Sequence, residues 1–497
     1  MAGRCANRRR HRNIVGACIA ALVIAGSVVA QTRPAGAAVP TISVVSSMQQ
    51  VRPTQTLSPT PGSVSLTSAR NEVESFQIVV QGPATNVSLS GDLFGWGTTG
   101  RYRMAYNDVV EPSDGEGAVG RWGDALIPEV DQLYSQNRNA FPFDVPSGEN
   151  RVIWVDVFVP TTVGSGVFAD SLTLSANGTS TQVAVTLEVL NLTIPATSSL
   201  RSAFYLNYQS GSDDSICRAH TGTNNCGGDA TLRRTLYSMY SRLALDNRTT
   251  LANGSGLRAD QNPANYLTAE WENLIEGPTI RGTGAVPAGA KWRLGNAQAT
   301  TVSQYAYRDW HCRTACANAW EAEATEAGQD FSNKFVWYGC DEPNDSATEW
   351  ATCAPFANEA KTAWNRPSMV TATIGQLNAR AGPAGMPDTG ILVPPINRIH
   401  DKPGQLLAGD QRPTYNAFLG TPGRELWLYA SCLSHGCGGD TFGSPISYWD
   451  GWPGYAVDAP AVQSRAMSWM AWRYDATGEL YWSVNARLDS AFSSGGL

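Results

Sequence analysis

The pattern of apolar and polar residues changes near residue 195, and this change constrains the fold more than any other feature. Between residues 39 and 198, short runs that alternate apolar and polar residues are separated by turn-forming residues, as is typical of β-strands. Asn177-Gly178 lies between two such runs and is a strong hairpin signal. Because these strands follow one another with no helical stretch, we predict a β-sandwich over residues 38–198.

After residue 195, stretches with helical periodicity alternate with brief apolar runs. The helical stretches cover residues 231–246, 314–327, 346–364 and 459–474. The apolar runs, which we interpret as strands, cover residues 202–206, 335–338, 369–374, 391–394, 426–429 and 480–484. This alternation across residues 199–497 predicts a parallel sheet, with a (β/α)8-type barrel as the leading form. A doubly wound sheet is the alternative, although no Gly-x-Gly-x-x-Gly motif or phosphate loop follows a strand.

The N-terminus has the composition of a secretory signal peptide. Five arginines lie between residues 4 and 12, an apolar run without charge covers residues 14–30, and Ala35-Gly36-Ala37 offers small residues for cleavage. We therefore predict a signal peptide over residues 1–37 and a secreted protein. An uncleaved membrane anchor is the alternative reading of so long an apolar run. No later segment is long and apolar enough to span a bilayer.

The charge of the chain limits its partners. Without the first 37 residues, 30 basic and 43 acidic side chains remain, a formal charge of −13. The basic residues are scattered and form no stripe. A surface of this kind disfavours nucleic acid and anionic lipid, and we expect neither as a partner. The sequence offers no motif for a cofactor, and we expect none.

The eight cysteines beyond residue 37 fall into four close pairs. The pairs are Cys217 with Cys226, Cys312 with Cys316, Cys340 with Cys353, and Cys432 with Cys437. An even count in an exported chain indicates disulfides, and nearest-neighbour pairing is the simplest connectivity. The second pair is the least suited to a disulfide, because its spacing within a helix gives poor geometry. Zinc is the alternative, but no Cys-x-x-Cys or His-Glu-x-x-His spacing occurs, so we expect no metal.

One apolar run ends in two adjacent carboxylates. Residues 335–340 read FVWYGC, and Asp341, Glu342 and Pro343 follow directly. A sheet interior is unfavourable for unpaired charges, so we expect the two acids where the strand leaves the sheet. Neighbouring side chains of a strand point to opposite faces, so the pair can act together only if the chain turns, which Pro343 favours. The alternative is a solvated loop whose acids cap the next helix.

In a parallel barrel, the carboxyl ends of the strands form the active-site face. Polar residues there are candidates for substrate binding, and aromatic residues offer flat apolar platforms for sugar rings. The candidates are Asn207, Tyr208, Trp337, Tyr338, Asn397, Trp427, Tyr429, Trp449, Trp452, Asp458 and Trp482. Carboxylates with aromatic platforms in a secreted barrel point to glycoside hydrolysis, with a glycan as substrate. No Gly-x-Ser-x-Gly elbow follows a strand, which disfavours an esterase.

Six motifs, taken in order, resemble glycoside hydrolase family 123 and related secreted bacterial proteins. They are ARNEVESFQ at residues 69–77, DALIP at 124–128, WVDVFVP at 154–160, YGCDEP at 338–343, GWPGYAVD at 451–458 and TGELYW at 477–482. Members of this family with known activity are N-acetyl-β-galactosaminidases in which the acetamido oxygen of the substrate attacks the anomeric carbon. The resemblance implies that Asp341 orients the acetamido group and stabilises the charge of the intermediate. It implies that Glu342 is the acid and then the base.

Relatives continue beyond the strand at residues 480–482 into a further strand and a closing helix, whereas this chain stops at Leu497. The sequence therefore leaves open whether the last barrel unit is present, and an incomplete barrel would expose a sheet edge. Two other functions are alternatives to substrate assistance. One is a retaining hydrolase of a sugar without an acetamido group, with a distant carboxylate such as Asp458 or Glu479 as nucleophile. The other is a secreted glycan-binding protein on a decayed hydrolase scaffold.

Overall fold

The computed structural model describes residues 39–58, 60, 62–131, 135–206, 215–252, 293–294, 297–305, 318–319, 321–322, 325, 332–343, 346–381, 386–431, 446–485 and 488–489. Internal contacts divide the chain into residues 1–38 and 39–497, and everything below concerns the second unit. The predicted signal peptide, Asn207, Tyr208 and the cysteine pairs Cys312 with Cys316 and Cys432 with Cys437 lie outside the described residues.

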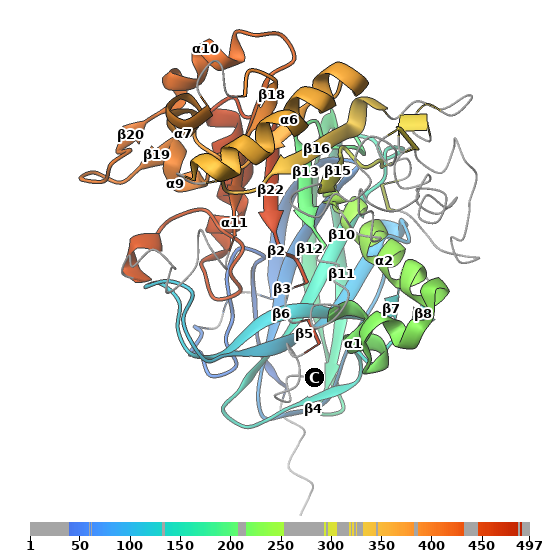
Figure 1. Cartoon of the computed structure of the whole chain (residues 1–497). Helices are drawn as coiled ribbons and strands as arrows, with labels where there is room; N and C mark the ends of the chain where they lie inside the picture. The colour runs from blue at the N-terminus through green and yellow to red at the C-terminus, as the bar shows by residue number, and fades with distance from the viewer. Residues whose placement is uncertain are drawn as a thin grey trace, which may run out of the picture. The chain divides into compact units, whose positions relative to one another are not determined.

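Two five-stranded sheets form the N-terminal part of the second unit (Figure 1). The first has the order β1 (Thr41–Ser46), β3 (Glu72–Gln81), β10 (Asn150–Val159), β5 (Thr99–Val109) and β6 (Gly120–Pro128), all antiparallel. The second has the order β2 (Ser63–Arg70), β12 (Thr179–Thr193), β11 (Gly166–Ala176), β4 (Ala84–Ser90) and β9 (Phe143–Val145). Short β7 (Val130–Asp131) and β8 (Gln136–Asn137) pair beside them.

Alternating side chains from both sheets meet in one hydrophobic core, as the sequence pattern predicts for a sandwich. Ile78 and Val155 come from the first sheet, and Leu174 and Val185 from the second. The predicted hairpin is present: Ala176 pairs with Thr179, and both Asn177 and Gly178 have positive φ, at 53° and 72°. Asn-Gly tolerates this conformation at little cost, which explains the turn at this position.

A parallel sheet of eight strands follows the sandwich and is almost closed into a barrel. Its order is β14 (Leu251–Ala252), β13 (Arg201–Tyr205), β22 (Gly478–Trp482), β21 (Glu425–Ala430), β18 (Thr389–Leu392), β17 (Ser368–Val370), β16 (Phe335–Cys340) and β15 (Val302–Tyr305). Between β14 and β15, the backbone N–H of Thr300 donates to Thr250 Oγ1 at 2.8 Å, which links the two ends of the sheet. Of the two predicted forms of the parallel sheet, the structure therefore has the barrel and not the doubly wound sheet.

The sheet contains eight strands, and β22 is the last of them along the chain. Strand β22 pairs with β21 on one side and with β13 on the other, so it occupies the eighth position of the ring. The sequence pattern identified six strands and missed β14 and β15, because two and four residues carry too little periodicity. On the outer side of β22 and β13, Tyr455 packs against Phe204 and Tyr481, with ring centroids 5.5 and 5.0 Å apart.

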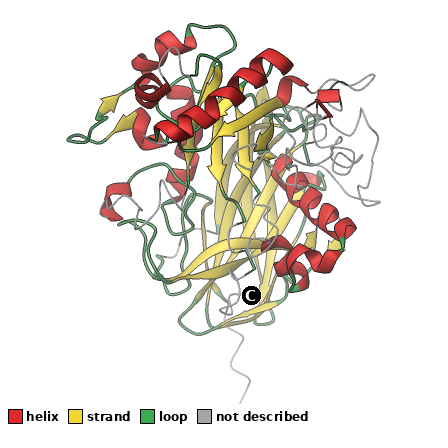
Figure 2. Ribbon diagram, viewed as in Figure 1, coloured by secondary structure: helices red, strands yellow, loops and turns green. Residues whose placement is uncertain are grey.

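Helices lie at the periphery of the strands (Figure 2). They are α1 (Ser215–Thr221), α2 (Ala230–Leu245), α6 (Ala347–Trp364), α7 (Ile374–Gln376), α9 (Ile396–Ile399), α10 (Asn416–Leu419) and α11 (Ala461–Arg473). Three of the four predicted helices correspond to α2, α6 and α11 within two residues at each end, and most of residues 314–327 lies outside the described part. No helix in the described ranges has both the length and the hydrophobicity needed to cross a bilayer.

Two of the predicted disulfides are present. Cys217 is bonded to Cys226, between α1 and the following turn, and Cys340 is bonded to Cys353, between the end of β16 and α6. These bonds exclude the zinc alternative for these four cysteines. Disulfides are compatible with the predicted secretion, because they persist in oxidising compartments.

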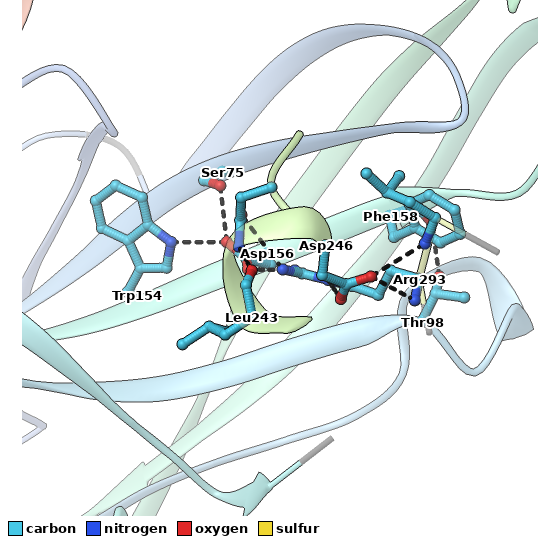
Figure 3. A network of polar contacts seen from close by, with 10 residues as sticks. Ser75, Thr98, Trp154, Asp156, Phe158, Leu243, Asp246 and Arg293 are labelled. Atoms are coloured by element: carbon cyan, nitrogen blue, oxygen red, sulfur yellow. Dashed lines mark hydrogen bonds and ion pairs between the residues drawn. The ribbon is translucent and has the colours of Figure 1, made fainter. Parts of the chain in front are cut away.

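An ion-pair network joins the sandwich to the barrel (Figure 3). The guanidinium of Arg293 lies 2.9 Å from Asp156 on β10 and 3.0 Å from Asp246, which ends α2. Asp246 Oδ1 also accepts hydrogen bonds from the backbone N–H groups of Arg293 and Leu294. All three charged side chains are at most 13% exposed, so each charge is compensated within the protein.

Candidate active site

The end of β16 fixes the position of the two adjacent acids. All six residues of the strand are buried, and the strand ends at Cys340, which the disulfide to Cys353 attaches to α6. Gly339 leaves no room for a side chain, because a Cβ atom there would lie 1.8 Å from the ring of Phe356 on the same helix. The close packing of β16 against α6 therefore fixes the position of the backbone at Asp341.

The chain turns directly after the strand, as the sequence predicts. Glu342 has a φ of 41°, a left-handed conformation that is uncommon for a residue with a side chain. The acids do not cap the next helix: Ser346 is the N-cap of α6 and accepts a hydrogen bond from the backbone N–H of Glu349. The alternative of a helix-capping loop was therefore wrong.

Asp341 lies in a polar environment at the ends of two neighbouring strands. Its Oδ1 accepts a hydrogen bond from the hydroxyl of Tyr338 on β16 at 2.6 Å. Thr371, the residue after β17, donates to the same oxygen at 3.4 Å. These two donors fix the orientation of the carboxylate.

Glu342 is held by Thr371 and by a third strand. Its backbone N–H donates to Thr371 Oγ1 at 2.6 Å, and its Oε1 accepts a hydrogen bond from the hydroxyl of Tyr429 on β21 at 2.7 Å. Burial raises the pKa of Glu342 and the neighbouring charge of Asp341 raises it further, while the hydrogen bond from Tyr429 acts in the opposite direction. A raised pKa suits a carboxyl group that must donate a proton.

Three tyrosines line the barrel interior below the acids. Tyr205, Tyr338 and Tyr429 belong to one cluster of buried residues, and the hydroxyl of Tyr205 lies 2.6 Å from Ser303 Oγ on β15. Burial raises the pKa of all three hydroxyls, and the carboxylates of Asp341 and Glu342 raise those of Tyr338 and Tyr429 as well. The tyrosines therefore stay neutral, and two of them donate hydrogen bonds to the acids, Tyr338 to Asp341 and Tyr429 to Glu342.

Four predicted aromatic platforms are buried and do not offer a face for a sugar ring. Trp337 is 0% exposed and packs against Trp364 of α6, because its position in β16 points outward. Trp427 is also 0% exposed; it points inward, but Gly478 at the start of β22 lies against its ring, so it fills the amino-terminal end of the barrel. Trp449 and Trp452 are 2% and 8% exposed and pack together with Tyr448.

Trp482 is the exception among these predicted platforms. It ends β22, pairs with Tyr205 across the sheet and is 36% exposed. Its strand neighbour Leu480 belongs to the interior cluster, and residues two apart share a face, so Trp482 lies on the inner face at the carboxyl end. An aromatic side chain that stacks against a sugar ring would need this position.

Two further predicted residues form hydrogen bonds with groups other than the acid pair. Asn397 in α9 is buried, and its Nδ2 donates to the hydroxyl of Tyr448 at 3.2 Å. Asp458 is 0% exposed and accepts a hydrogen bond from the backbone N–H of Ser113 at 2.9 Å, so it holds a loop of the sandwich. The prediction that Asp458 lines a substrate pocket was wrong, because protein atoms surround its carboxylate completely.

Glu479, the other suggested nucleophile, lies on the outer face of β22. It is 4% exposed and accepts a hydrogen bond from the hydroxyl of Tyr455. Its neighbour Leu480 faces the barrel interior, so Glu479 faces away from it. Neither suggested distant nucleophile therefore lies on the side of the barrel interior.

Sequence reasoning missed Thr371, Tyr205 and Ser303 as residues of the site. Thr371 contacts both acids, and its place directly after a strand was a usable signal, since that criterion selected Asp341. Tyr205 and Ser303 support the site from within the barrel, where no single residue type gives a signal.

The fold and site together define a class: a β-sandwich followed by a (β/α)8 barrel with an Asp-Glu pair at the carboxyl end of a strand. Among solved structures, the chain is similar to a family 123 glycoside hydrolase from Clostridium perfringens, described in connection with glycolipid glycan hydrolysis. The two share 12% identity over 90% of this chain and 79% of that chain, with a TM-score of 0.53. The resemblance to family 123 that the motifs suggested is thus confirmed in the fold.

Other comparisons add nothing to the assignment. The C-terminal domain of the Streptococcus pyogenes antigen I/II-family protein AspA is 14% identical over 30% of this chain and 46% of its own, with a TM-score of 0.17. Bacteroides thetaiotamicron EndoBT-3987 is 8% identical over 74% of this chain and 86% of its own, with a TM-score of 0.15. Neither likeness is close enough to carry an argument. No protein-family model and no curated protein sequence matches the chain.

Proposed function

We propose that this protein is a secreted glycosidase that acts on N-acetylhexosaminides by a substrate-assisted retaining mechanism. The observation that carries the proposal is the contrast between the two adjacent acids. Asp341 accepts hydrogen bonds from Tyr338 and Thr371, whereas burial raises the pKa of Glu342. A carboxyl group with a raised pKa suits a proton donor, and a neighbouring carboxylate oriented by two hydroxyl groups suits the stabilisation of a positive intermediate.

In this mechanism Glu342 donates its proton to the leaving oxygen while the acetamido oxygen of the substrate attacks the anomeric carbon. The glycosidic bond breaks, and an oxazolinium ion forms with its charge next to Asp341. Glu342, now ionised, then removes a proton from the water that opens the ring, which restores the acetamido group and the configuration. A substrate that supplies its own nucleophile needs no second carboxylate across the sugar ring.

The positions of Asp458 and Glu479 favour this mechanism over one with an enzymic nucleophile. An ordinary retaining hydrolase holds its two carboxyl groups about 5 Å apart on opposite sides of the bond. Asp458 and Glu479 are both nearly fully buried outside the barrel interior. The likeness to the clostridial enzyme supports glycoside hydrolysis in general, and the sugar and the linkage belong to the proposal.

The test is hydrolysis of an aryl N-acetyl-β-galactosaminide by the mature protein, beside the matching aryl β-galactoside. We expect release of the aryl group from the first substrate only, and a loss of about 10²–10⁴-fold in kcat/KM for Glu342→Gln. Glu359→Gln, on helix α6, is a matched control and should retain activity.

Unaltered activity in Glu342→Gln would refute the assignment. Cleavage of the galactoside, together with covalent labelling of a carboxylate by a fluorinated glycoside, would show that the enzyme uses its own nucleophile and not substrate assistance. Glycan binding without turnover of either substrate would favour a decayed scaffold.

A further inference from the structure

A pocket that is separate from the acid pair lies between the sandwich and the barrel. It encloses about 370 Å³, within the range of small-molecule sites, and its walls come from β3, β5, β6 and β10 on one side and residues 454–464 on the other. The hydrogen bond from Gln50 Nε2 to the carbonyl oxygen of Val457, at 3.0 Å, connects the two sides. Neither Asp341 nor Glu342 takes part in its walls.

Gln77 in the pocket wall is a buried amide with an unused acceptor. Its Nε2 donates to the carbonyl oxygens of Ser46 and Gln49, at 2.8 and 2.6 Å, which fixes the orientation of the side chain. The residue is 1% exposed, and within the described part of the chain its Oε1 has no hydrogen-bond donor. A buried acceptor without a donor is costly, and a ligand that donates a hydrogen bond would remove the cost.

Asp124 supplies the second acceptor. Its Oδ2 accepts a hydrogen bond from Asn107 Nδ2 at 2.7 Å, and Oδ1 has no donor among the described residues. Asp124 is also the one charged side chain in the described walls of the pocket. A lone carboxylate repels anionic ligands, so phosphate, sulfate and carboxylate groups do not suit this pocket.

The remaining walls are aromatic and aliphatic. The indole N–H of Trp154 donates to Asp156 Oδ1 at 2.7 Å, which holds the ring in place in the pocket wall (Figure 3). Tyr455 stands on the barrel side, and Met104 and the start of α11 add aliphatic surface. An aromatic ring and aliphatic groups beside convergent acceptors suit a ligand with apolar C–H faces and several hydroxyl donors.

We propose that this pocket binds a neutral, hydroxyl-rich small ligand of the monosaccharide class, with hydroxyl groups donating to Asp124 and to Gln77 Oε1. The site is a binding site beyond the proposed glycosidase centre. It takes no part in bond cleavage, and its existence does not depend on the chemistry of the barrel.

Binding can be observed at this pocket alone by fluorine NMR on the full-length mature protein labelled with 5-fluorotryptophan. The Trp154 resonance is assigned by its loss in Trp154→Phe. Methyl α-D-galactopyranoside is the neutral probe, D-galactosamine the cationic one and D-galacturonate the anionic one. We expect the neutral probe to shift the Trp154 resonance with saturation, and the anionic probe to leave it unchanged.

Two pairs of variants locate the effect. Ser464→Trp on α11 fills the pocket and should abolish the shift, while Ser468→Trp, on an exposed position of the same helix outside the pocket, should preserve it. Asp124→Ala should weaken binding at least about tenfold, because a hydrogen bond to a charged group is lost. Asp108→Ala, exposed on β5, should not change the affinity.

No shift with any neutral sugar would overturn the proposal, as would a shift that persists in Ser464→Trp. A shift with D-galactosamine alone would overturn the assignment to a neutral ligand. Because the readout is the Trp154 signal, these outcomes remain distinct from failure of the glycosidase proposal, which is judged by turnover.

Discussion

Asp341 and Glu342 are neighbours in sequence, yet their surroundings differ. The hydroxyl groups of Tyr338 and Thr371 donate hydrogen bonds to Asp341. Glu342 is partly withdrawn from water and lies beside that charge, so its proton is held more firmly. A single residue, Thr371, contacts both acids, so its hydroxyl couples their positions.

Replacing Tyr429 by Phe should shift the pH dependence of hydrolysis. The Tyr429 hydroxyl donates to Glu342 and favours its ionised form, so its removal raises the pKa of Glu342 further. An acid catalyst is active below its pKa, and the basic limb of kcat/KM should therefore move to higher pH. Tyr415→Phe, at a buried tyrosine outside the site, is the control. A basic limb that stays in place in Tyr429→Phe would contradict the role of Glu342 as acid.

At this scale, the sequence predicted the turn at the two acids, whereas it misjudged the exposure of most of the aromatic residues. Two charges at the end of an apolar run stand out because the run cannot enclose them. Trp337 and Trp427 gave no comparable signal, since an indole suits both a core and a sugar platform. Whether an indole lies in the core or is exposed to a ligand depends on the strand register and on the neighbouring helix. The local sequence determines neither of these.

Among the elements, β16 and α6 act as one rigid unit. The Cys340–Cys353 disulfide and the contact of Gly339 with Phe356 hold the strand end against the helix. The helix itself was predictable from its periodicity and its N-cap Ser346. The requirement for glycine at residue 339 was not, because it arises from a helix that begins eight residues later.

Gly339→Ala should destabilise the protein and reduce hydrolysis together. The added Cβ would meet the Phe356 ring at 1.8 Å, and overpacking of this kind costs about 1–3 kcal/mol. The displaced strand end carries Asp341, so activity should fall as well. Gly164→Ala, where a Cβ meets nothing within 4 Å, is the matched control in thermal unfolding and kinetic assays. Equal behaviour of the two variants would exclude a tight contact at residue 339.

Strand β22 carries a buried acid that should make stability depend on pH. Burial raises the pKa of Glu479 to about 7, although Tyr455 donates a hydrogen bond to it. Because the folded pKa lies above the unfolded one, stability should fall as pH rises from about 4.5 to 7 and then level off. Glu479→Gln should remove this fall and add up to about 3 kcal/mol on the alkaline side. Urea unfolding across the pH range measures the free energy of unfolding of both proteins. The same pH dependence in the wild type and in Glu479→Gln would contradict the prediction.

The whole molecule depends on contacts between its two parts that no local pattern foretells. The alternation of strands and helices predicted both architectures. It gave no sign that Arg293 would bridge Asp156 in the sandwich and Asp246 beside the barrel, because these residues are far apart in sequence. Nor did it indicate that Asp458 would hold a sandwich loop.

Arg293→Met should weaken the union of sandwich and barrel. It leaves two carboxylates that are at most 13% exposed without their cation, which costs about 3–5 kcal/mol. Calorimetry should show a lower transition temperature. Lys361→Met is the control, since Lys361 pairs with Asp388 while 57% exposed and should cost less than about 1 kcal/mol. A similar loss in both variants would mean that the bridge is no stronger than a surface pair.

The pairing of β22 with β13 also bears on how the chain reaches its native state. Ala203 lies opposite Leu480, so this contact joins nearly the first and the last of the barrel residues. Contacts of such sequence separation have the largest loop-closure entropy and slow folding. Tyr205 and Tyr429 belong to the two strands that flank β22, so the hydroxyl that donates to Glu342 reaches its final environment only when β22 has paired with both. Catalytic competence should therefore appear with the slowest phase of refolding, after most helical signal has returned.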